Sequence, residues 1–149
     1  MLESLRAMEQ KEQDYFDYFL NQVEISNEKV AVSDGARIDI VIYKPRSLGL
    51  MYGAAYIYAH GGGAFAFEAK DFNNMMAVTC VNLECIVVSV NFRKGPEVKC
   101  PRGQLDYADV VYHIMKNPTR YRIDTNRVCM AGISGGGWIV TGAANIMAK

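Results

Sequence analysis

The sequence lacks the features of several broad classes of protein. No run among its 149 residues approaches the ~18 apolar residues of a membrane-spanning helix. Residues 1–20 carry charged side chains throughout, so we expect no signal peptide and a cytoplasmic location. The 16 basic and 16 acidic residues balance and form no basic stripe, which argues against nucleic acid as a partner.

Cysteine and histidine are also scarce. The four cysteines, Cys80, Cys85, Cys100 and Cys129, contain no C-x-x-C pair, and their spacing does not suit a zinc site. Cys85 and Cys129 fall in predicted buried strands, which suits inert thiols in a reducing compartment. We therefore expect no metal and no cofactor.

What remains is the composition of a globular chain. Of its 149 residues, 50% are hydrophobic and 21% are charged. A chain of this length and composition can form one modest domain with a hydrophobic core.

The strongest local pattern lies near the C-terminus. Val128–Ala131 is a continuous apolar run that predicts a buried strand, and the small-residue segment 138–148 predicts a helix. Between them stands Gly132-Ile133-Ser134-Gly135-Gly136-Gly137. Strand, glycine-flanked serine and helix are the context of a nucleophile elbow, a sharp turn that exposes the serine Oγ. Taken alone, the stretch could also be a turn that caps a helix, or an anion site at its N-terminus.

A second glycine-rich stretch follows another predicted strand. Tyr56–Ala59 runs directly into His60-Gly61-Gly62-Gly63. An oxyanion hole needs backbone N–H groups that converge on one point, and glycines allow a loop to provide them. Alone, this could be a flexible turn with a chance histidine. The two motifs together, each at the end of a predicted strand, favour a serine hydrolase.

The rest of the pattern predicts an α/β fold. Residues 2–20 are predicted to form a charged helix with an aromatic end, and Asp34-Gly35 between two alternating runs predicts a β-hairpin over 23–43. Beyond it, strands at 52–59, 85–90 and 128–131 alternate with helices at 71–83, 102–117 and 138–148. The packed face of the helix at 102–117 is expected to include Leu105, Ala108, Val111, Tyr112 and Met115. This alternation implies a mostly parallel sheet with helices on both faces, and the hairpin adds an antiparallel edge.

With these motifs, residues 23–149 resemble the N-terminal half of an α/β-hydrolase of the hormone-sensitive-lipase-like group, which includes arylacetamide deacetylases and many bacterial esterases. The similar parts are HGGG at 60–63, the segment 91–97 with Pro101 and Asp106, which resembles Y-R-L-A-P-E, and 132–137, which resembles G-D-S-A-G-G. The sequence departs from the family pattern at Ile133, usually Asp, at Gly135, usually Ala, and at Lys94-Gly95, usually Leu-Ala.

The resemblance implies an incomplete α/β-hydrolase fold that acts on small-molecule esters. Ser134 would attack the ester carbonyl and form an acyl-enzyme, and the N–H groups of Gly62, Gly63 and Gly135 would form the oxyanion hole. His60 would anchor its loop rather than act as the base. Residues 1–22 would belong to a helical cap and 23–149 to the N-terminal half of the hydrolase domain; an amphipathic helix packed on the domain is the alternative for the first segment.

The general base is missing from this pattern. In α/β-hydrolases an Asp or Glu and then a His follow the serine, yet residues 135–149 contain none of these. His113 falls in the middle of a predicted helix, where a histidine is far more often a surface or core-edge residue. Asp106 and Asp109 on the same helix are expected to form a solvated face with one loop anchor. The chain therefore resembles a fragment that is inactive alone.

Two other functions stay open. The chain could be a non-catalytic binding protein that reuses the pocket, or an interaction module whose unpaired strand, Val128–Ala131, docks a partner. In the resembled fold that strand is central, so an unpaired edge predicts self-association or binding of a C-terminal half. Apolar surface around Ile139, Val140 and Ile146 is expected to lose its cover as well.

Overall fold

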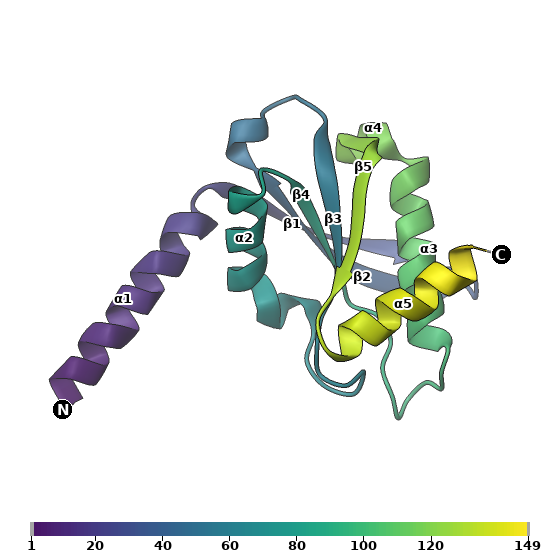
Figure 1. The fold of residues 1–149 in the computed structure, drawn as a ribbon, viewed down its shortest axis with the longest axis horizontal. Coiled ribbons are helices and arrows are strands. Elements are labelled where there is room, and N and C mark those ends of the chain that lie inside the picture. The colour runs from purple at the N-terminus through teal and green to yellow at the C-terminus, as the bar shows by residue number, and fades with distance from the viewer. Residues whose placement is uncertain (1, 149) are drawn as a thin grey trace.

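The computed structural model describes residues 2–148, which form one five-stranded sheet in the order β1-β2-β4-β3-β5 (Figure 1). The elements in chain order are α1 (Leu2–Leu20), β1 (Val23–Ala31), β2 (Arg37–Pro45), η1 (Arg46–Leu48), β3 (Gly53–Ala59), η2 (Ala69–Phe72), α2 (Asn73–Asn82), β4 (Ile86–Val90), α3 (Arg102–Lys116), α4 (Pro118–Tyr121), β5 (Ile123–Gly132) and α5 (Gly135–Met147).

The sheet combines two kinds of strand pairing. β3 runs parallel to both β4 and β5, whereas β1 pairs with β2, and β2 with β4, in antiparallel fashion. Gly35, with a φ of 87°, allows the turn between β1 and β2, as Asp-Gly predicts. The predicted α/β class, the parallel β-strands and the antiparallel hairpin are confirmed.

Helices cover both faces of the sheet. Successive side chains of a strand point to opposite faces, so each face carries apolar side chains on which helices pack. On β2, Ile40 and Ile42 enter the core shared with α3 and α5, whereas Val41 and Tyr43 enter the core shared with α2. β4 is buried along its whole length, as expected for a continuous apolar run with neighbours on both sides. The Tyr107 hydroxyl ties α3 to the sheet by donating to the Ile57 carbonyl at 2.6 Å.

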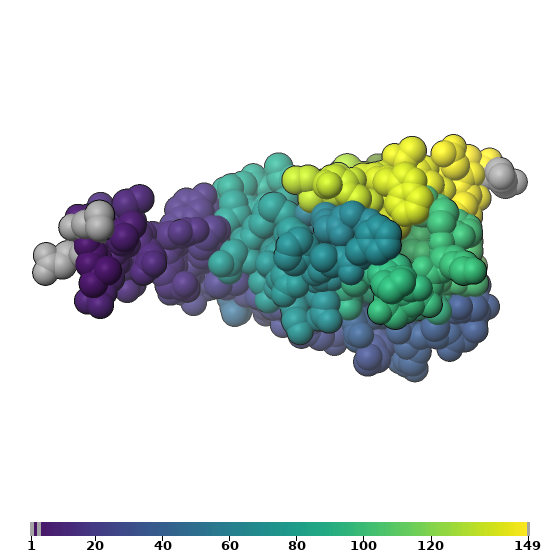
Figure 2. All heavy atoms as spheres, turned by 90° about the horizontal axis from the view of Figure 1, so that it is seen from below, coloured from purple at the N-terminus to yellow at the C-terminus, as the bar shows by residue number. Residues whose placement is uncertain are grey.

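α1 projects away from the rest of the molecule (Figures 1 and 2). Leu5, Met8 and Tyr15 are exposed, and only the end of the helix packs on the body, where Phe19 is buried among residues of α2. The predicted helix is confirmed, and its packing on the domain is limited to this end.

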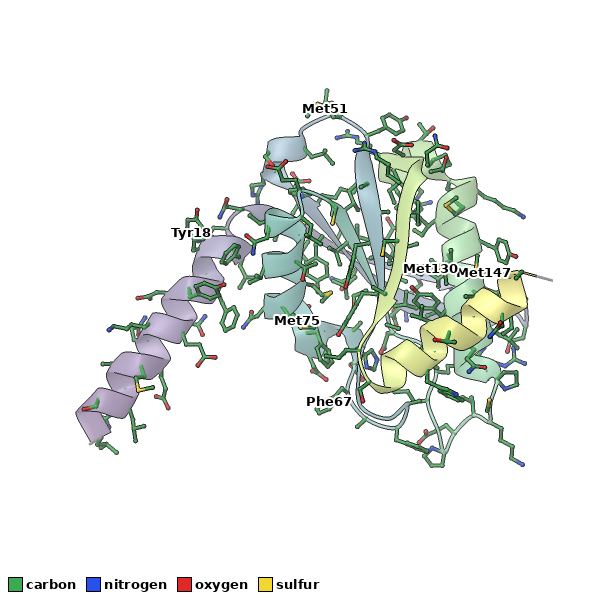
Figure 3. All side chains as sticks on the ribbon, viewed as in Figure 1. Tyr18, Met51, Phe67, Met75, Met130 and Met147 are labelled. Carbon is green, nitrogen blue, oxygen red and sulfur yellow. The ribbon has the colours of Figure 1, made fainter. Side chains whose placement is uncertain are left out.

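β3, β4 and β5 run parallel to one another, so their carboxyl ends lie together at the same end of the sheet. Three segments gather there, and Figure 2 looks onto them: the loop after β3, the loop of residues 91–101, and the start of α5. Phe67 marks the first of these loops in Figure 3. In α/β sheets this end is where ligands bind.

β5 differs from the prediction in its burial. Among residues 2–148 it pairs with β3 alone, and Cys129, expected in a buried strand, is exposed. Met130 lies toward α5 and is half-buried (Figure 3). A continuous apolar run gives a strand, but its burial depends on neighbours on both sides, and β5 has one.

The predicted helix faces were partly wrong as well. α3 buries Tyr107, Val110 and Ile114, whereas Tyr112, expected on the packed face, is 43% exposed. On α5, Ile139 is buried against the core, and Val140 and Ile146 are half-buried. The apolar surface expected around Ile139 is therefore smaller than predicted. None of the helices within residues 2–148 combines the length and apolarity needed to cross a bilayer.

We expect the 149-residue polypeptide to self-associate through the outer edge of β5, because its N–H and C=O groups there are open to pairing. Cys129→Lys places a charge in the middle of this strand and should reduce the association, as measured by multi-angle light scattering. Cys100→Lys changes the other exposed cysteine, in a loop away from β5, and should have no effect. A wild-type monomer with a sharp cooperative melt would contradict the expectation.

Candidate active site

Ser134 lies at the junction of β5 and α5, exposed to solvent, with φ 53° and ψ −122°. A residue with a side chain rarely adopts such a positive φ, and this strain is typical of functional turns. The turn is fixed by backbone hydrogen bonds, from Gly136 N–H to Ile133 O at 2.8 Å and from Gly137 N–H to Ser134 O at 2.9 Å. The glycine-flanked serine therefore forms the sharp, exposed turn that the sequence predicts.

The glycines after Ser134 permit a close approach of two backbones. A Cβ on Gly136 would lie 2.5 Å from His60 O and overlap Ala59 O. A Cβ on Gly135 would lie only 2.7 Å from Gly63 N. The first turn of α5 thus packs directly on the end of β3 and the loop that follows it.

The loop after β3 is a tight turn against Ser134. Gly62 has a φ of 106°, and its carbonyl accepts hydrogen bonds from the N–H groups of Phe65 and Ala66, both at 3.0 Å. A Cβ on Gly61 would lie 3.8 Å from Ser134 Cβ. The two predicted motifs, far apart in the sequence, therefore come together at one point.

Backbone N–H groups collect at this point. Within residues 2–148, no protein group accepts a hydrogen bond from the N–H of Gly62 or Gly63. Gly135 opens α5, so its N–H has no acceptor inside the helix. These are the N–H groups that the family resemblance assigns to an oxyanion hole.

His60 lies beneath this loop with no exposed surface. Its ring stacks between Phe92, at a centroid distance of 4.6 Å, and Phe72, at 5.7 Å. Nδ1 lies 2.7 Å from the Gly61 carbonyl, which can only accept, so Nδ1 carries the hydrogen. Burial lowers the pKa of His60 and keeps the imidazole neutral, although the hydrogen bond to Gly61 opposes this shift.

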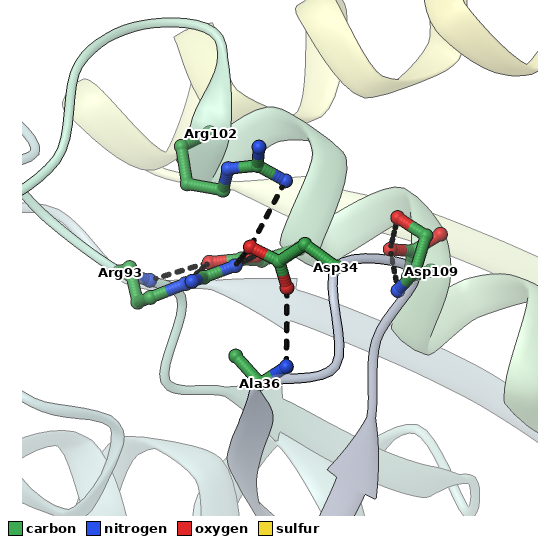
Figure 4. A network of polar contacts seen from close by, with 7 residues as sticks. Asp34, Ala36, Arg93, Arg102 and Asp109 are labelled. Atoms are coloured by element: carbon green, nitrogen blue, oxygen red, sulfur yellow. Dashed lines mark hydrogen bonds and ion pairs between the residues drawn. The ribbon is translucent and has the colours of Figure 1, made fainter.

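A charged network holds the neighbouring loop of residues 91–101 (Figure 4). The Arg93 guanidinium donates to both carboxylate oxygens of Asp106, at 2.9 and 2.6 Å, and its Nη2 also reaches Asp34 at 2.9 Å. Arg102 binds Asp34 at 3.3 Å from the other side. The hydrogen bond from Ala36 N–H, together with Arg93, lowers the pKa of Asp34. This loop in turn supports the glycine loop, because Gly95 N–H donates to Ala64 O at 2.9 Å.

The prediction for the two aspartates of α3 was only partly correct. Asp106, expected on a solvated face or as a loop anchor, is completely buried against Arg93. Asp109 accepts hydrogen bonds from the backbone N–H and the hydroxyl of Ser33, at 2.9 and 2.7 Å, and so anchors the hairpin turn. Both residues anchor loops, and neither forms a solvated face.

His113 lies far from Ser134 along the fold. It is near the C-terminal end of α3, where its Nε2 lies 3.0 Å from the Tyr121 hydroxyl of α4. In Figure 1, α4 lies at one end of the strands and the start of α5 at the other end. No cluster of three or more His, Cys, Asp or Glu residues in the described part of the chain could hold a metal ion.

No pattern in the sequence indicates the pocket that lies beside the glycine loop. The pocket has a volume of about 330 Å³ and lies between the glycine loop, the loop of residues 91–101 and the starts of α3 and α5. Phe65 and Trp138, both largely exposed, form part of its wall.

We predict that Gly136→Ala destabilises the protein strongly, whereas Gly137→Ala does not. A methyl group on Gly136 would collide with the end of β3, and overpacking of this kind costs about 1–3 kcal/mol or more. The same methyl on Gly137 has its nearest neighbour at 3.5 Å, and alanine favours the helix by up to ~1 kcal/mol. Urea unfolding of both variants measures this difference; equal stabilities would refute the close approach.

A second prediction concerns pH. Because the folded-state pKa of His60 lies below the value of about 6.5 for an unfolded chain, the unfolded state binds more protons as the pH falls below neutral. The free energy of unfolding should therefore decrease from pH 7 toward pH 5, by at most ~1.4 kcal/mol per pH unit for this group.

His60→Gln should flatten this dependence, whatever its effect on stability at pH 7. His113→Gln is the comparison, since burial also lowers the pKa of His113 but its side chain is only half-buried. Thermal melts at a series of pH values provide the measurement. A slope that His60→Gln leaves unchanged would mean that the imidazole is already charged or accessible.

Comparison with known proteins gives a consistent result. Residues 56–149 match the family described as alpha/beta hydrolase fold. Human arylacetamide deacetylase-like 2 is 33% identical over 124 residues, which are 78% of this chain and 31% of that protein. Ethyl acetate hydrolase of Pseudomonas putida is 26% identical over 125 residues, 83% of this chain and 39% of that protein. The chain thus spans about a third of the length of these relatives.

Solved structures agree on the fold. Esterase LipW from Mycobacterium marinum superposes with a TM-score of 0.77 at 23% identity, over 94% of this chain and 44% of that one. The hyperthermophilic esterase from the archaeon Pyrobaculum calidifontis gives 0.79 at 24% identity, over 99% and 47%. From the motifs, the elbow geometry and these matches together, the chain belongs to the alpha/beta hydrolase fold family, in the hormone-sensitive-lipase-like group of esterases and arylacetamide deacetylases.

Proposed function

We propose that this chain carries the nucleophile and the oxyanion hole of a carboxylic-ester hydrolase. One observation carries the proposal: the strained, exposed Ser134 stands against a loop in which the N–H groups of Gly62 and Gly63 have no protein acceptor within residues 2–148. A helix cap alone would need neither the strain nor the second loop. An anion site at the helix N-terminus would not need a serine held in this conformation.

The reaction follows from this geometry. Ser134 Oγ attacks the ester carbonyl carbon, and the carbonyl oxygen becomes an oxyanion that accepts hydrogen bonds from Gly62, Gly63 and Gly135. The tetrahedral intermediate collapses, the alcohol leaves with a proton, and an acyl-serine remains, which water then hydrolyses. Each N–H donor of this kind contributes roughly 100- to 1,000-fold to the rate.

His60 and Arg93 position the site in this proposal. His60 is neutral, buried between two aromatic rings and bonded to Gly61, so it fixes the path of the glycine loop. Arg93, whose pKa is raised mainly by its hydrogen bonds to Asp106, fixes the adjacent loop. Neither group is available to accept the proton from Ser134.

The general base and its carboxylate come from outside the described residues in this mechanism. Residues 135–149 hold no Asp, Glu or His, and His113 lies near α4, at the other end of the strands. We assign residues 23–149 to the half of a hydrolase domain that carries the nucleophile, and residues 1–22 to a cap over its substrate. The substrate is a small-molecule ester, and the cytoplasmic location expected from the sequence remains part of this proposal.

The 149-residue polypeptide alone should hydrolyse short-chain aryl esters at close to the uncatalysed rate, because it lacks a base near Ser134. Joined to the C-terminal part of ethyl acetate hydrolase, residues 1–149 should react with an alkyl fluorophosphonate, and Ser134→Ala should abolish the labelling. Ser47→Ala removes another exposed serine and should leave it intact. Mass spectrometry of the labelled peptide gives the result. Labelling that persists in Ser134→Ala would overturn the assignment, and a polypeptide that binds ester without labelling would instead support a binding protein.

A further inference from the structure

A second concave site lies at the other end of the strands from Ser134, next to α4 (Figure 1). It has a volume of about 250 Å³ and lies between the C-terminal end of β2, the loop of residues 46–50 and the residue that follows α4. Three cationic side chains line it, Lys44, Arg46 and Arg122. Among the described residues that line it, Glu24 alone is acidic. We call this cavity the Arg122 site.

Arg122 is held in a fixed orientation. It follows α4 with φ 57° and ψ 44°, a left-handed conformation that residues with a side chain rarely adopt. Its Nη1 donates to the Gly49 carbonyl at 2.8 Å, and its own carbonyl accepts from the Gly53 N–H at 2.9 Å. A guanidinium carries five N–H groups, and the others on Arg122 meet no acceptor within residues 2–148. They are available to a ligand.

Arg122 differs in this respect from its neighbours in the sequence. Arg120 binds the Glu28 carboxylate at 2.8 Å, and Arg127 binds the Asp124 carboxylate at 2.8 Å. No carboxylate among the described residues pairs with Arg122. The usual fate of an arginine in this part of the chain is an ion pair, and Arg122 is the exception.

Lys44 places a second cation near this guanidinium, also without a partner. It is half-buried, and its position on β2 directs it to the same face of the sheet as Ile42, the face on which α4 lies. Within residues 2–148, no carboxylate or carbonyl binds its ammonium group. Burial lowers the pKa of Lys44, and the charge of Arg122 lowers it further. An anion between the two cations would relieve this repulsion.

The acidic side chain at the rim does not neutralise the site. Glu24 Oε1 lies 3.8 Å from Arg46 Nη1, and both side chains are largely exposed, at 68% and 59%. An exposed ion pair of this kind contributes little. Arg46 is held instead through its Nε, which donates to the Asn21 carbonyl at 3.1 Å. Three positive charges and one negative charge leave the site with a formal charge of +2.

This charge and these donors match a phosphate monoester. At pH 7 such a group carries a charge of about −1.5 to −2 and offers three acceptor oxygens. A guanidinium binds two of these oxygens at once, and an ammonium group adds a point charge. Pro45 and Leu48 also line the site, so the carbon skeleton of the ligand meets apolar surface. The volume lies below the range of about 300–1,000 Å³ for drug-sized ligands, which favours a small molecule.

We propose that the Arg122 site binds the phosphate group of a phosphate monoester, with Arg122 and Lys44 on its oxygens and Arg46 at the rim. The site is remote from Ser134, so the proposal does not depend on the hydrolase function. Phosphatidic acid presents the same group at a lipid surface, and the experiments below distinguish it from a free ligand.

Thermal melts of the 149-residue polypeptide test the binding. Glycerol 3-phosphate should raise the Tm in a saturable way, because a ligand that binds the folded state stabilises it. Glycerol, and sodium chloride at the same ionic strength, should not. Lys44→Gln should weaken binding at least about tenfold. Lys11→Gln removes the same charge from α1 and should have no effect. Equal responses to glycerol 3-phosphate and to sodium chloride would overturn the proposal.

A second variant tests the role of the guanidinium. Arg122→Lys keeps the positive charge but loses the two-pronged geometry, so we expect weaker binding. Lys44→Arg keeps both charge and donors and should retain it. Full affinity in either Lys44→Gln or Arg122→Lys would overturn the proposed contacts.

Chemical modification gives a readout that does not depend on stability. Under limiting acetic anhydride, glycerol 3-phosphate should slow the acetylation of Lys44 several-fold, because the bound phosphate covers its amine. Lys11, exposed on α1, should react at the same rate with and without the ligand. Mass spectrometry of the peptides measures both rates. An unchanged rate at Lys44 would contradict occupancy of the site.

Vesicle sedimentation identifies the source of the phosphate. Phosphatidylcholine vesicles with and without phosphatidic acid are the two probes. Protection of Lys44 by glycerol 3-phosphate without sedimentation supports a free ligand. Sedimentation only with phosphatidic acid, lost in Lys44→Gln and reversed by glycerol 3-phosphate, supports a lipid headgroup. Binding to neither probe would overturn the proposal, whatever the reactivity of Ser134.

Discussion

The site depends on one close contact between two backbones. The first turn of α5 lies so near the end of β3 that a methyl group on Gly136 would collide with Ala59 and His60, and one on Gly135 with Gly63. The position of Ser134 and the positions of the Gly62 and Gly63 N–H groups are therefore not independent. Any shift of α5 relative to β3 changes both at once, which explains why glycine is needed at positions 135 and 136.

Buried polar groups support the loops next to this contact, although burying a polar group costs free energy. His60 is buried without charge, with its Nε2 unpaired within the described residues. Asp106 is buried opposite Arg93. Buried ion pairs contribute little net stability compared with apolar packing, but the loss of one partner is strongly destabilising. These residues are better explained by the loop geometry that they fix than by the stability that they add.

Much of this was predictable from the sequence, and the errors have physical causes. Strand and helix order, the hairpin and the two glycine motifs depend on local patterns, and the structure contains all of them. Burial depends on neighbours: Cys129 is exposed because β5 lies at a sheet edge, and Tyr112 is exposed because apolar spacing does not fix the phase of α3. The partner of Asp106, Arg93, lies outside its own helix, so no pattern within the helix identifies it. The pocket beside the glycine loop has walls from several segments, which no single pattern can show.

The order of the sheet also explains which part of the chemistry these residues can hold. β3 and β5 are neighbours, so the N–H donors and Ser134 are brought together by one strand pairing and one helix contact, all within residues 53–137. The proposed mechanism also needs a general base, but His60 is buried beneath the glycine loop and His113 lies near α4. Binding of the substrate carbonyl and removal of the serine proton are therefore structurally separate. In the proposed function, a polypeptide that contains the first part alone is expected to bind an ester without hydrolysing it, and this binding can be measured by itself.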